Sequence, residues 1–527
     1  MRKNRLPKQL INKIKETYKQ GETNISNIAR LLYRDWRPNG DGTDIDSFRR
    51  HISKILVREG IRDTDSSDIQ EDYEIAQKRK LEKSTYYIVT WAQNSTPIHQ
   101  GMWENLLAYK KYLGAELSVI LGRYKNPTSI FSGVKHETWA QETKPYWDAK
   151  RHKIHPHLSI VSNMKIPPTR KYPLRGVKDF SRSDSVIVGH PSLHLVSEPI
   201  LKGYNHQVLV TSGALTLPNY TDSALGAIGH ENHKLGFVIV EIKDKNKFFI
   251  RQVEVAEDGS FVDLHHHVAK GEVKIKKEAL ALVCGDTHYW SIDEEVEEIN
   301  KTICDKFKVK NLVLHDVIDG ESANNHLDKR PVEKAQRFLN NQWSIEEELN
   351  SVGDWLETKL KYNPIIVRSN HNDRFDNILN QDWRKDIPNS LFYLDYTKKM
   401  LDGTIGQEGV VNYYLKDRFK DKVVTLDYDD SHVIGKYEVS QHGHFGSNGA
   451  KGSPVSFRNL GIPIILGHTH SPYRANDCLY VGTNTKLDLG YNRKGMSSWM
   501  HSNVLITSNG KAQHILIVGG EFTTFSL

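Results

Sequence analysis

The stretch PIILGHTHSPY, residues 463–473, joins a short apolar run to two closely spaced histidines. The run has the composition of a buried strand, and Gly467 ends it. His468 and His470 follow at once. They are either exposed residues of a polar turn or imidazoles directed at a ligand beyond the end of the strand. The second interpretation predicts further polar residues at the ends of neighbouring strands.

Four other stretches have the same form. ALALVCGDTHYW, VKNLVLHDVIDG, NPIIVRSNHND and GKYEVSQHGHFG each join an apolar strand to Asp, Asn or His. The carboxyl ends of neighbouring strands in an open α/β sheet meet at one edge, where such folds bind ligands. We therefore predict a single site built from five strand ends: Asp286, His288, Asp316, Asn370, His371, His442, His468 and His470.

The residue types at these ends indicate a metal site. Carboxylate, carboxamide and imidazole without thiolate suit divalent manganese, iron, zinc or magnesium. Two such ions about 3.5–4 Å apart activate a water and neutralise phosphate oxygens. A carboxylate such as that of Asp316 can bridge two ions.

The order D-x-H, (G)D-x-x-D, (G)N-H, H-G-H, G-H-x-H resembles that of the calcineurin-like metallophosphoesterases, over residues 279–527. The resemblance implies a β-sandwich flanked by helices and two divalent ions, with manganese expected and magnesium, iron or zinc as alternatives. It implies that His371 is the general acid. Asp319, the second carboxylate of the D-x-x-D motif, is expected either to have a structural role or to contact the metal ligands. It assigns the ions as follows: the first to Asp286, His288 and His470, the second to Asn370, His442 and His468, and both to Asp316.

Two positions depart from the family pattern. His315 stands where the family has the glycine of its second motif, and residues 369–373 read SNHND, with the acidic residue one place late. Neither departure removes an expected ligand.

Longer phrases resemble a phage-encoded group of phosphoesterases that includes a host-DNA-degrading protein. They include HGHFGSNGAKGSPVSFRNLG, AQNSTPIHQG, GRYKNPTS and PNYTDS, and they extend the resemblance to residues 85–527. In this interpretation Asn448 and Lys451, in the Gly-rich loop after His442, hold a DNA phosphate; the alternative is a plain surface turn. His444 is a further candidate for phosphate contact, and His326 for the substrate channel.

The first 62 residues are basic and helical in pattern. They hold fifteen Lys and Arg against seven Asp and Glu, a net charge of +8 beside +7 for the whole chain. Apolar residues recur at helical spacing in three segments, which outlines a helix-turn-helix DNA reader or a protein-contact bundle. In the DNA-binding interpretation the third helix presents four basic residues: Arg49, Arg50, Lys54 and Arg58.

We expect a mixed α/β protein with a helix-turn-helix-like domain at 1–62, a linker or exposed helix at 63–84, a central α/β domain at 85–275 and the phosphoesterase domain at 276–527. Three dispersed cysteines indicate a reduced compartment. No signal peptide or membrane span is evident. We therefore expect a cytoplasmic protein, in the host cytoplasm if it is phage-encoded, with no membrane partner.

The expected function is a two-metal-dependent deoxyribonuclease that acts on double-stranded DNA and degrades host DNA early in infection. The alternative is a DNA-binding regulator or transfer factor whose phosphoesterase domain binds a partner. A protein phosphatase or small-molecule phosphatase is a third interpretation, but it leaves the basic helices unexplained. Endonuclease or exonuclease mode and a closed homo-oligomer stay open.

Overall fold

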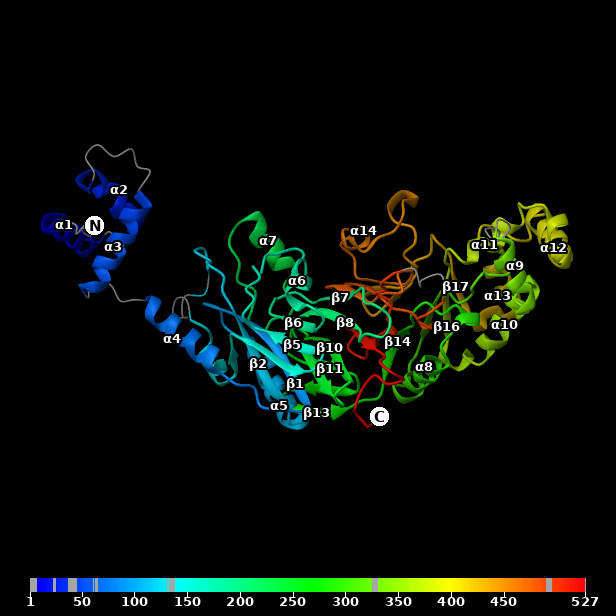
Figure 1. Cartoon of the computed structure of the whole chain (residues 1–527), viewed down its shortest axis with the longest axis horizontal. Coiled ribbons are helices and arrows are strands. Elements are labelled where there is room, and N and C mark those ends of the chain that lie inside the picture. Colours follow the sequence, from blue (N-terminus) through cyan, green and yellow to red (C-terminus); the bar gives the residue numbers. More distant parts are fainter. Residues whose placement is uncertain are drawn as a thin grey trace. The chain divides into compact units, whose positions relative to one another are not determined.

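The computed structural model describes residues 7–21, 25–36, 45–59, 61, 65–129, 131, 138–324, 330–489 and 495–526. The chain divides into two compact units (Figure 1). Unit 1 comprises Met1–Ile75 with Lys135–Thr138, and unit 2 comprises Ala76–Val134 with Trp139–Leu527. Within the described ranges, no helix combines the length and the apolar character that crossing a bilayer requires.

Unit 1 contains three amphipathic helices, α1 (Lys8–Lys19), α2 (Ile25–Trp36) and α3 (Ile45–Arg58). Their apolar faces share one core, and the ring of Trp36 stacks on Phe48 with centroids 4.7 Å apart. The three predicted helices are therefore present. The following helix, α4 (Asp65–Lys78), runs through the segment expected to be a linker or an exposed helix.

Unit 2 begins with the predicted strand-helix-strand segment. β1 (Tyr86–Gln93) and β2 (Glu116–Gly122) are parallel neighbours, connected by α5 (Gln100–Leu113). Their five-stranded sheet has the order β10-β9-β1-β2-β3. Its other strands are β3 (Trp147–Asp148), β9 (Gly236–Ile242) and β10 (Phe248–Glu254). A small sheet follows, with β11 (Phe261–Asp263), β12 (His266–Ala269) and β13 (Glu272–Ile275).

A ten-stranded sheet runs through the middle of unit 2, in the order β18-β19-β20-β22-β21-β7-β8-β6-β5-β4. One half comes from before residue 275: β4 (Arg151–His155), β5 (Leu158–Val161), β6 (Ser185–Val188), β7 (His194–Glu198) and β8 (Gln207–Thr211). The other half comes from after it: β18 (Val433–Ile434), β19 (Tyr437–Glu438), β20 (Ile464–Leu466), β21 (Tyr473–Ala475) and β22 (Cys478–Tyr480).

The two halves are joined where β21 pairs antiparallel with β7. The expected boundary between residues 275 and 276 therefore falls inside one compact unit, and strands from both sides of it share a sheet. A separate central domain at 85–275 stays a prediction, whereas the mixed α/β class is confirmed.

A six-stranded sheet, in the order β17-β16-β15-β14-β23-β24, packs against the β18–β22 half. Its strands are β14 (Ala279–Val283), β15 (Leu312–His315), β16 (Pro364–Val367), β17 (Val424–Leu426), β23 (Ser502–Thr507) and β24 (Ala512–Leu516). Alternate residues point to opposite faces of a strand. Val283, Val313 and Ile365 accordingly meet Ile465 and Leu479 in the core between the two sheets.

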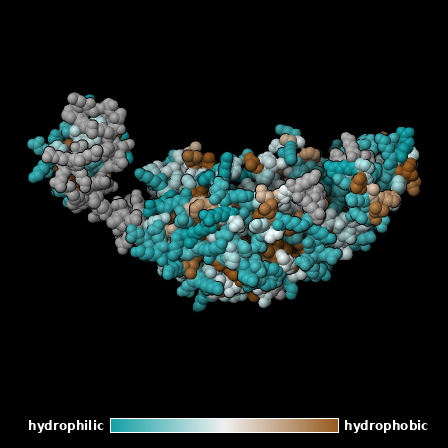
Figure 2. Space-filling view, viewed as in Figure 1, coloured by the Kyte–Doolittle hydropathy of each residue, from teal (hydrophilic) through white to brown (hydrophobic). Residues whose placement is uncertain are grey.

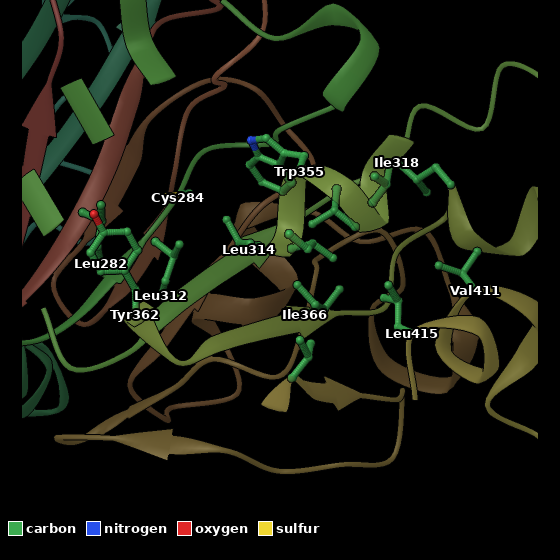
Figure 3. Packing of buried hydrophobic residues seen from close by; sticks show 14 of the residues in the cluster. Leu282, Cys284, Leu312, Leu314, Ile318, Trp355, Tyr362, Ile366, Val411 and Leu415 are labelled. Carbon is green, nitrogen blue, oxygen red and sulfur yellow. The ribbon is translucent and has the colours of Figure 1, made fainter. Parts of the chain in front are cut away.

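The other face of the six-stranded sheet is covered by helices (Figure 3). Leu282, Leu312, Leu314 and Ile366 contact an apolar cluster that includes Trp355. The helices in this cluster are α8 (Glu294–Lys306), α10 (Ile345–Glu357), α11 (Asn372–Ile378), α12 (Ser390–Leu401) and α13 (Gly409–Phe419). The sheet thus has one face against a second sheet and one against helices.

The remaining α-helices are α6 (Val177–Ser181), α7 (Ala224–Glu231), α9 (Pro331–Leu339) and α14 (Pro454–Arg458). The visible surface is largely hydrophilic, with apolar side chains gathered near α12, where Leu391, Leu394 and Leu401 are exposed (Figure 2).

Candidate metal centre

Parallel strands bring three of the predicted strand ends to one edge of the six-stranded sheet. β14, β15 and β16 are consecutive parallel neighbours, so their carboxyl ends meet. Asp286 and His288 follow β14, Asp316 follows β15, and Asn370 follows β16. The opposing sheet supplies the residues that follow its parallel strands β19 and β20: His442, His468 and His470. β19 is shorter than the predicted fourth strand.

Four of these residues form one buried cluster. Asp286, His288, Asp316 and His470 each place a ligand atom within 4.8 Å of the others. His470 Nε2 lies 3.2 Å from Asp286 Oδ2 and 3.3 Å from His288 Nε2. His288 Nε2 lies 3.5 Å from Asp316 Oδ2. Such a set of carboxylates and imidazoles can hold a metal ion.

Asp316 also faces a second group of candidates. Its Oδ2 lies 3.1 Å from His442 Nε2, and the His442 and His468 rings are 5.2 Å apart between centroids. Asn370 immediately precedes His371, whose ring centroid is 4.5 Å from that of His288. One carboxylate therefore lies between the histidines of both groups.

Several buried polar atoms here have no hydrogen-bond partner within the described residues. They are both carboxylate oxygens of Asp286, Asp316 Oδ1, Asn370 Oδ1, both ring nitrogens of His442, and His470 Nδ1. A buried polar atom left unpaired costs about 1–3 kcal/mol. Oxygen and nitrogen donors that converge without partners fit a bound divalent cation, which would satisfy several of them at once.

The backbone of the candidate ligands is also unusual. His288, Asp316, His468 and His470 have φ of +42°, +43°, +76° and +55°. Non-glycine residues in this region cost about 1–3 kcal/mol each, and such strain is concentrated at functional sites. Hydrogen bonds stabilise these conformations: His288 N donates to Asp316 O (2.6 Å), and Met500 N donates to His470 O (3.1 Å).

Burial keeps two of the candidate imidazoles neutral. Burial lowers the pKa of His470 to about 3 and that of His468 to about 4, so both rings are neutral at pH 7. A neutral imidazole is the form that ligates metals. Burial, with the nearby charge of Asp316, raises the pKa of Asp286 to about 7. A bound cation would supply a counter-charge for the Asp286 carboxylate.

Asp319, in the second motif, is hydrogen-bonded to residues near the first motif and near the third. Its carboxylate accepts hydrogen bonds from Trp290 N (2.7 Å) and Ser291 Oγ (2.8 Å), just after the first motif. Its carbonyl accepts from His371 Nδ1 and from Arg374 Nη1, in the third. These contacts are compatible with a structural role for Asp319, which stays a prediction.

His371 is held in one orientation by that contact. Because a carbonyl only accepts, Nδ1 carries the proton, and Nε2 is the nitrogen left for proton exchange. Burial lowers the pKa of His371. Its role as general acid stays a proposal.

The Gly-rich loop after His442 is exposed at Asn448 and Lys451. Asn448 has φ +58°. Lys451 pairs with Phe445 in an isolated antiparallel β-bridge. The charge of Lys451 is among those that, after burial, lower the pKa of His468, which places the lysine near the site. His444 is buried beside His442. His326 lies outside the described residues.

The basic candidates for DNA contact belong to α3 in unit 1. Arg49 is exposed there. The side chains of Arg50, Lys54 and Arg58 lie outside the described residues.

Three residues near the site have no role assigned from the sequence. His315, the replacement for the family glycine, is buried with neither ring nitrogen hydrogen-bonded among the described residues. The Trp499 ring lies 4.2 Å from that of His470, and the Tyr428 ring lies 5.5 Å from that of His444. Tyr428 and Trp499 lie between or after the motifs, so only the fold brings them to the site.

Comparison with known proteins gave few matches, and no family model matches the chain. The chain is similar to a phage protein. It is 27% identical over 536 aligned positions to Protein A1 of Escherichia phage T5, which covers 96% of this chain and 90% of Protein A1. A solved structure of Vps29 from Chaetomium thermophilum aligns with 36% of this chain and 96% of its own, at 11% identity and a TM-score of 0.20. That TM-score is too low to support a common fold.

Proposed function

We propose that this protein is a phosphodiesterase that uses two divalent ions, most readily manganese, to cleave DNA. The observation that carries the proposal is the position of Asp316. Its Oδ2 lies 3.5 Å from His288 Nε2 on one side and 3.1 Å from His442 Nε2 on the other. A carboxylate placed between two sets of imidazoles is the arrangement that a two-ion site needs.

Each residue group has a separate task in this proposal. Asp286, His288 and His470 would hold one ion, and Asn370, His442 and His468 would hold the other. Asp316 would be a ligand of both. When bound, the ions supply an activated water at neutral pH and offset the negative charge of the phosphate. His371, protonated on both ring nitrogens, would donate its Nε2 proton to the departing ester oxygen, while the Asp319 carbonyl accepts the hydrogen bond from Nδ1.

DNA is the proposed substrate because of features outside the metal centre. The basic segment folds as three helices with their own core, as a DNA-binding unit would. The similarity to a protein of phage T5 supports a phage origin. For a phage nuclease, the role we propose is to break down host DNA in the host cytoplasm. A regulator that binds DNA without cleaving it remains the alternative outcome.

A cleavage assay on linear and closed-circular duplex DNA tests the proposal. The purified protein is compared in manganese, in magnesium and in EDTA. Cleavage of circles with manganese, lost in EDTA, indicates a metal-dependent endonuclease, and cleavage of linear DNA alone indicates an exonuclease. Binding of both without cleavage would reject the nuclease and favour the regulator.

Two substitutions separate metal binding from proton transfer. Asp316→Ala removes the shared carboxylate, so we expect loss of bound manganese and of cleavage together. His371→Ala leaves the ligands in place, so we expect manganese content and DNA affinity to stay unchanged while the turnover rate falls about 10²–10⁴-fold. Metal content by mass spectrometry and single-turnover kinetics measure the two effects.

The matched control is His230→Ala, because His230 is an exposed histidine of α7. It should retain full activity. Cleavage by His371→Ala at the rate of the unmodified protein would refute the assignment of the general acid.

A further inference from the structure

His444 is a buried histidine that the proposed mechanism leaves without a task. It follows His442 by two residues and is 8% exposed. Neither of its ring nitrogens has a hydrogen-bond partner within the described part of the chain. Buried polar side chains are nearly always hydrogen-bonded, so a buried imidazole without a partner needs an explanation.

The ring lies beside the histidines proposed for the second ion. Its centroid is 5.3 Å from that of His442 and 5.9 Å from that of His468. That side already has four proposed protein ligands, counting the shared Asp316. Catalytic metal sites keep a position open for water or substrate. His444 is not needed as a ligand, so its ring is well placed to contact the water or substrate at that open position.

Aromatic side chains fix the orientation of the ring. Phe445 and Tyr428 lie 4.2 Å and 5.5 Å from it between centroids. The hydroxyl of Tyr428 donates to Asp373 Oδ2 at 2.7 Å. The guanidinium of Arg368 lies 4.6 Å from the Tyr428 ring centroid and donates to Asp373 Oδ1 at 3.0 Å. The chain from Asp373 to His444 thus connects the third motif to the fourth.

The backbone fixes His444 from the other side. Gly452 N donates to His444 O at 2.8 Å. A Cβ on residue 452 would lie 2.0 Å from Gly443 O, so only glycine permits this approach. Lys451, the preceding residue, is exposed and adds a positive charge near His468.

We propose that His444 is a substrate-positioning residue that hydrogen-bonds a phosphate oxygen of the DNA on the His442 and His468 side, and that Tyr428 holds its ring in place. This inference rests on the proposed function. A rigid imidazole and a flexible lysine on one loop together match a phosphate, since one supplies a directed donor and the other a charge. The His444 imidazole is already held in position before the substrate binds, whereas the Lys451 side chain is exposed and flexible.

The test uses full-length protein loaded with manganese, and inorganic phosphate as the probe. His444→Ala should retain its manganese content but bind phosphate about tenfold or more weakly in calorimetry. KM for duplex DNA should rise by a similar factor, with a smaller change in kcat. His444→Gln, whose side-chain amide can still donate, should recover part of the affinity.

Tyr428→Phe is the matched variant for the positioning role. It keeps the aromatic ring and removes the hydrogen bond to Asp373, so we expect phosphate binding to weaken by about two- to threefold. Thermal melting of each variant establishes that it is folded, and His444→Gln provides the measurement if His444→Ala is not.

Each outcome gives a decision. Loss of manganese in both His444 variants would make His444 a metal ligand and overturn the inference. Unchanged phosphate affinity and KM would overturn it as well. If the unmodified protein binds phosphate but cleaves no DNA, the nuclease proposal fails, and phosphate affinity alone decides the role of His444. If it binds no phosphate, the inference fails.

Discussion

Gly467 shows how closely the residues around the metal cluster are packed. It lies between the last residue of β20, Leu466, and the proposed ligand His468. A Cβ built on it would lie 2.4 Å from Asp286 Oδ1 and 2.9 Å from His315 Cγ. Neither neighbour is the end of a long, flexible side chain, so a methyl group must displace a proposed ligand or the buried ring.

Gly467→Ala should therefore weaken the metal centre. We expect manganese to bind at least tenfold more weakly, and unfolding free energy to fall by about 1–3 kcal/mol, as overpacking usually costs. Calorimetric titration with manganese and urea denaturation in EDTA measure the two effects. Gly495→Ala is the control, because a Cβ there meets no atom within 4 Å. Equal manganese affinity in the two variants would contradict the steric argument.

The residues of the cluster could be predicted because each stands at a fixed place after an apolar strand. Asp286, His288, Asp316 and His470 meet as that pattern requires. Tyr428 could not be found in this way, since its contact with His444 depends on how two loops pack. His315 departs from the family pattern in the sequence, but no sequence pattern indicates that its buried ring nitrogens would have no partner among the described residues.

At the scale of elements, helices were easier to predict than sheets. α3 places Phe48, Ile52 and Leu56 in one core, and this spacing is local information. The pairing of β21 with β7 joins residues 277 to 281 positions apart, and no periodicity encodes such a partner. The sheet that runs across the expected domain boundary therefore became visible only in the fold.

Arg49 on α3 gives an element-scale prediction about DNA. If α3 contacts the phosphate backbone, Arg49→Ala removes about one phosphate contact. The slope of log affinity against log salt should then become shallower by about 0.9. Fluorescence anisotropy with duplex DNA over a range of salt concentrations measures the slope.

Lys301→Ala is the control for Arg49. Lys301 is an exposed cation of α8, and its substitution removes the same charge from unit 2. Its salt slope should match that of the unmodified protein. If both variants shift the slope equally, net charge rather than α3 determines binding.

For the whole molecule, buried histidines away from the metal cluster link stability to pH. Burial lowers the pKa of His190 to about 3, that of His233 to about 4 and that of His514 to about 3. His514 Nε2 is hydrogen-bonded to Tyr473 O at 3.1 Å, which holds the ring inside the fold. These rings stay neutral in the folded protein at pH values where the unfolded chain binds protons.

The sign of the effect follows from proton linkage. Below pH 6.5 the unfolded state binds more protons than the folded state, so unfolding becomes easier as pH falls. Each such histidine should cost about 2 kcal/mol at pH 5 relative to pH 7, and the loss continues down to the folded pKa. Urea denaturation at both pH values, with EDTA present so that bound metal does not contribute, measures the difference in unfolding free energy.

His514→Gln should reduce this difference between pH 5 and pH 7 by about 2 kcal/mol, whatever its own cost in stability. His230→Gln, at an exposed position of α7, should leave it unchanged. An equal pH dependence in the His514 variant and the unmodified protein would mean that His514 takes up a proton in the folded state, against its burial.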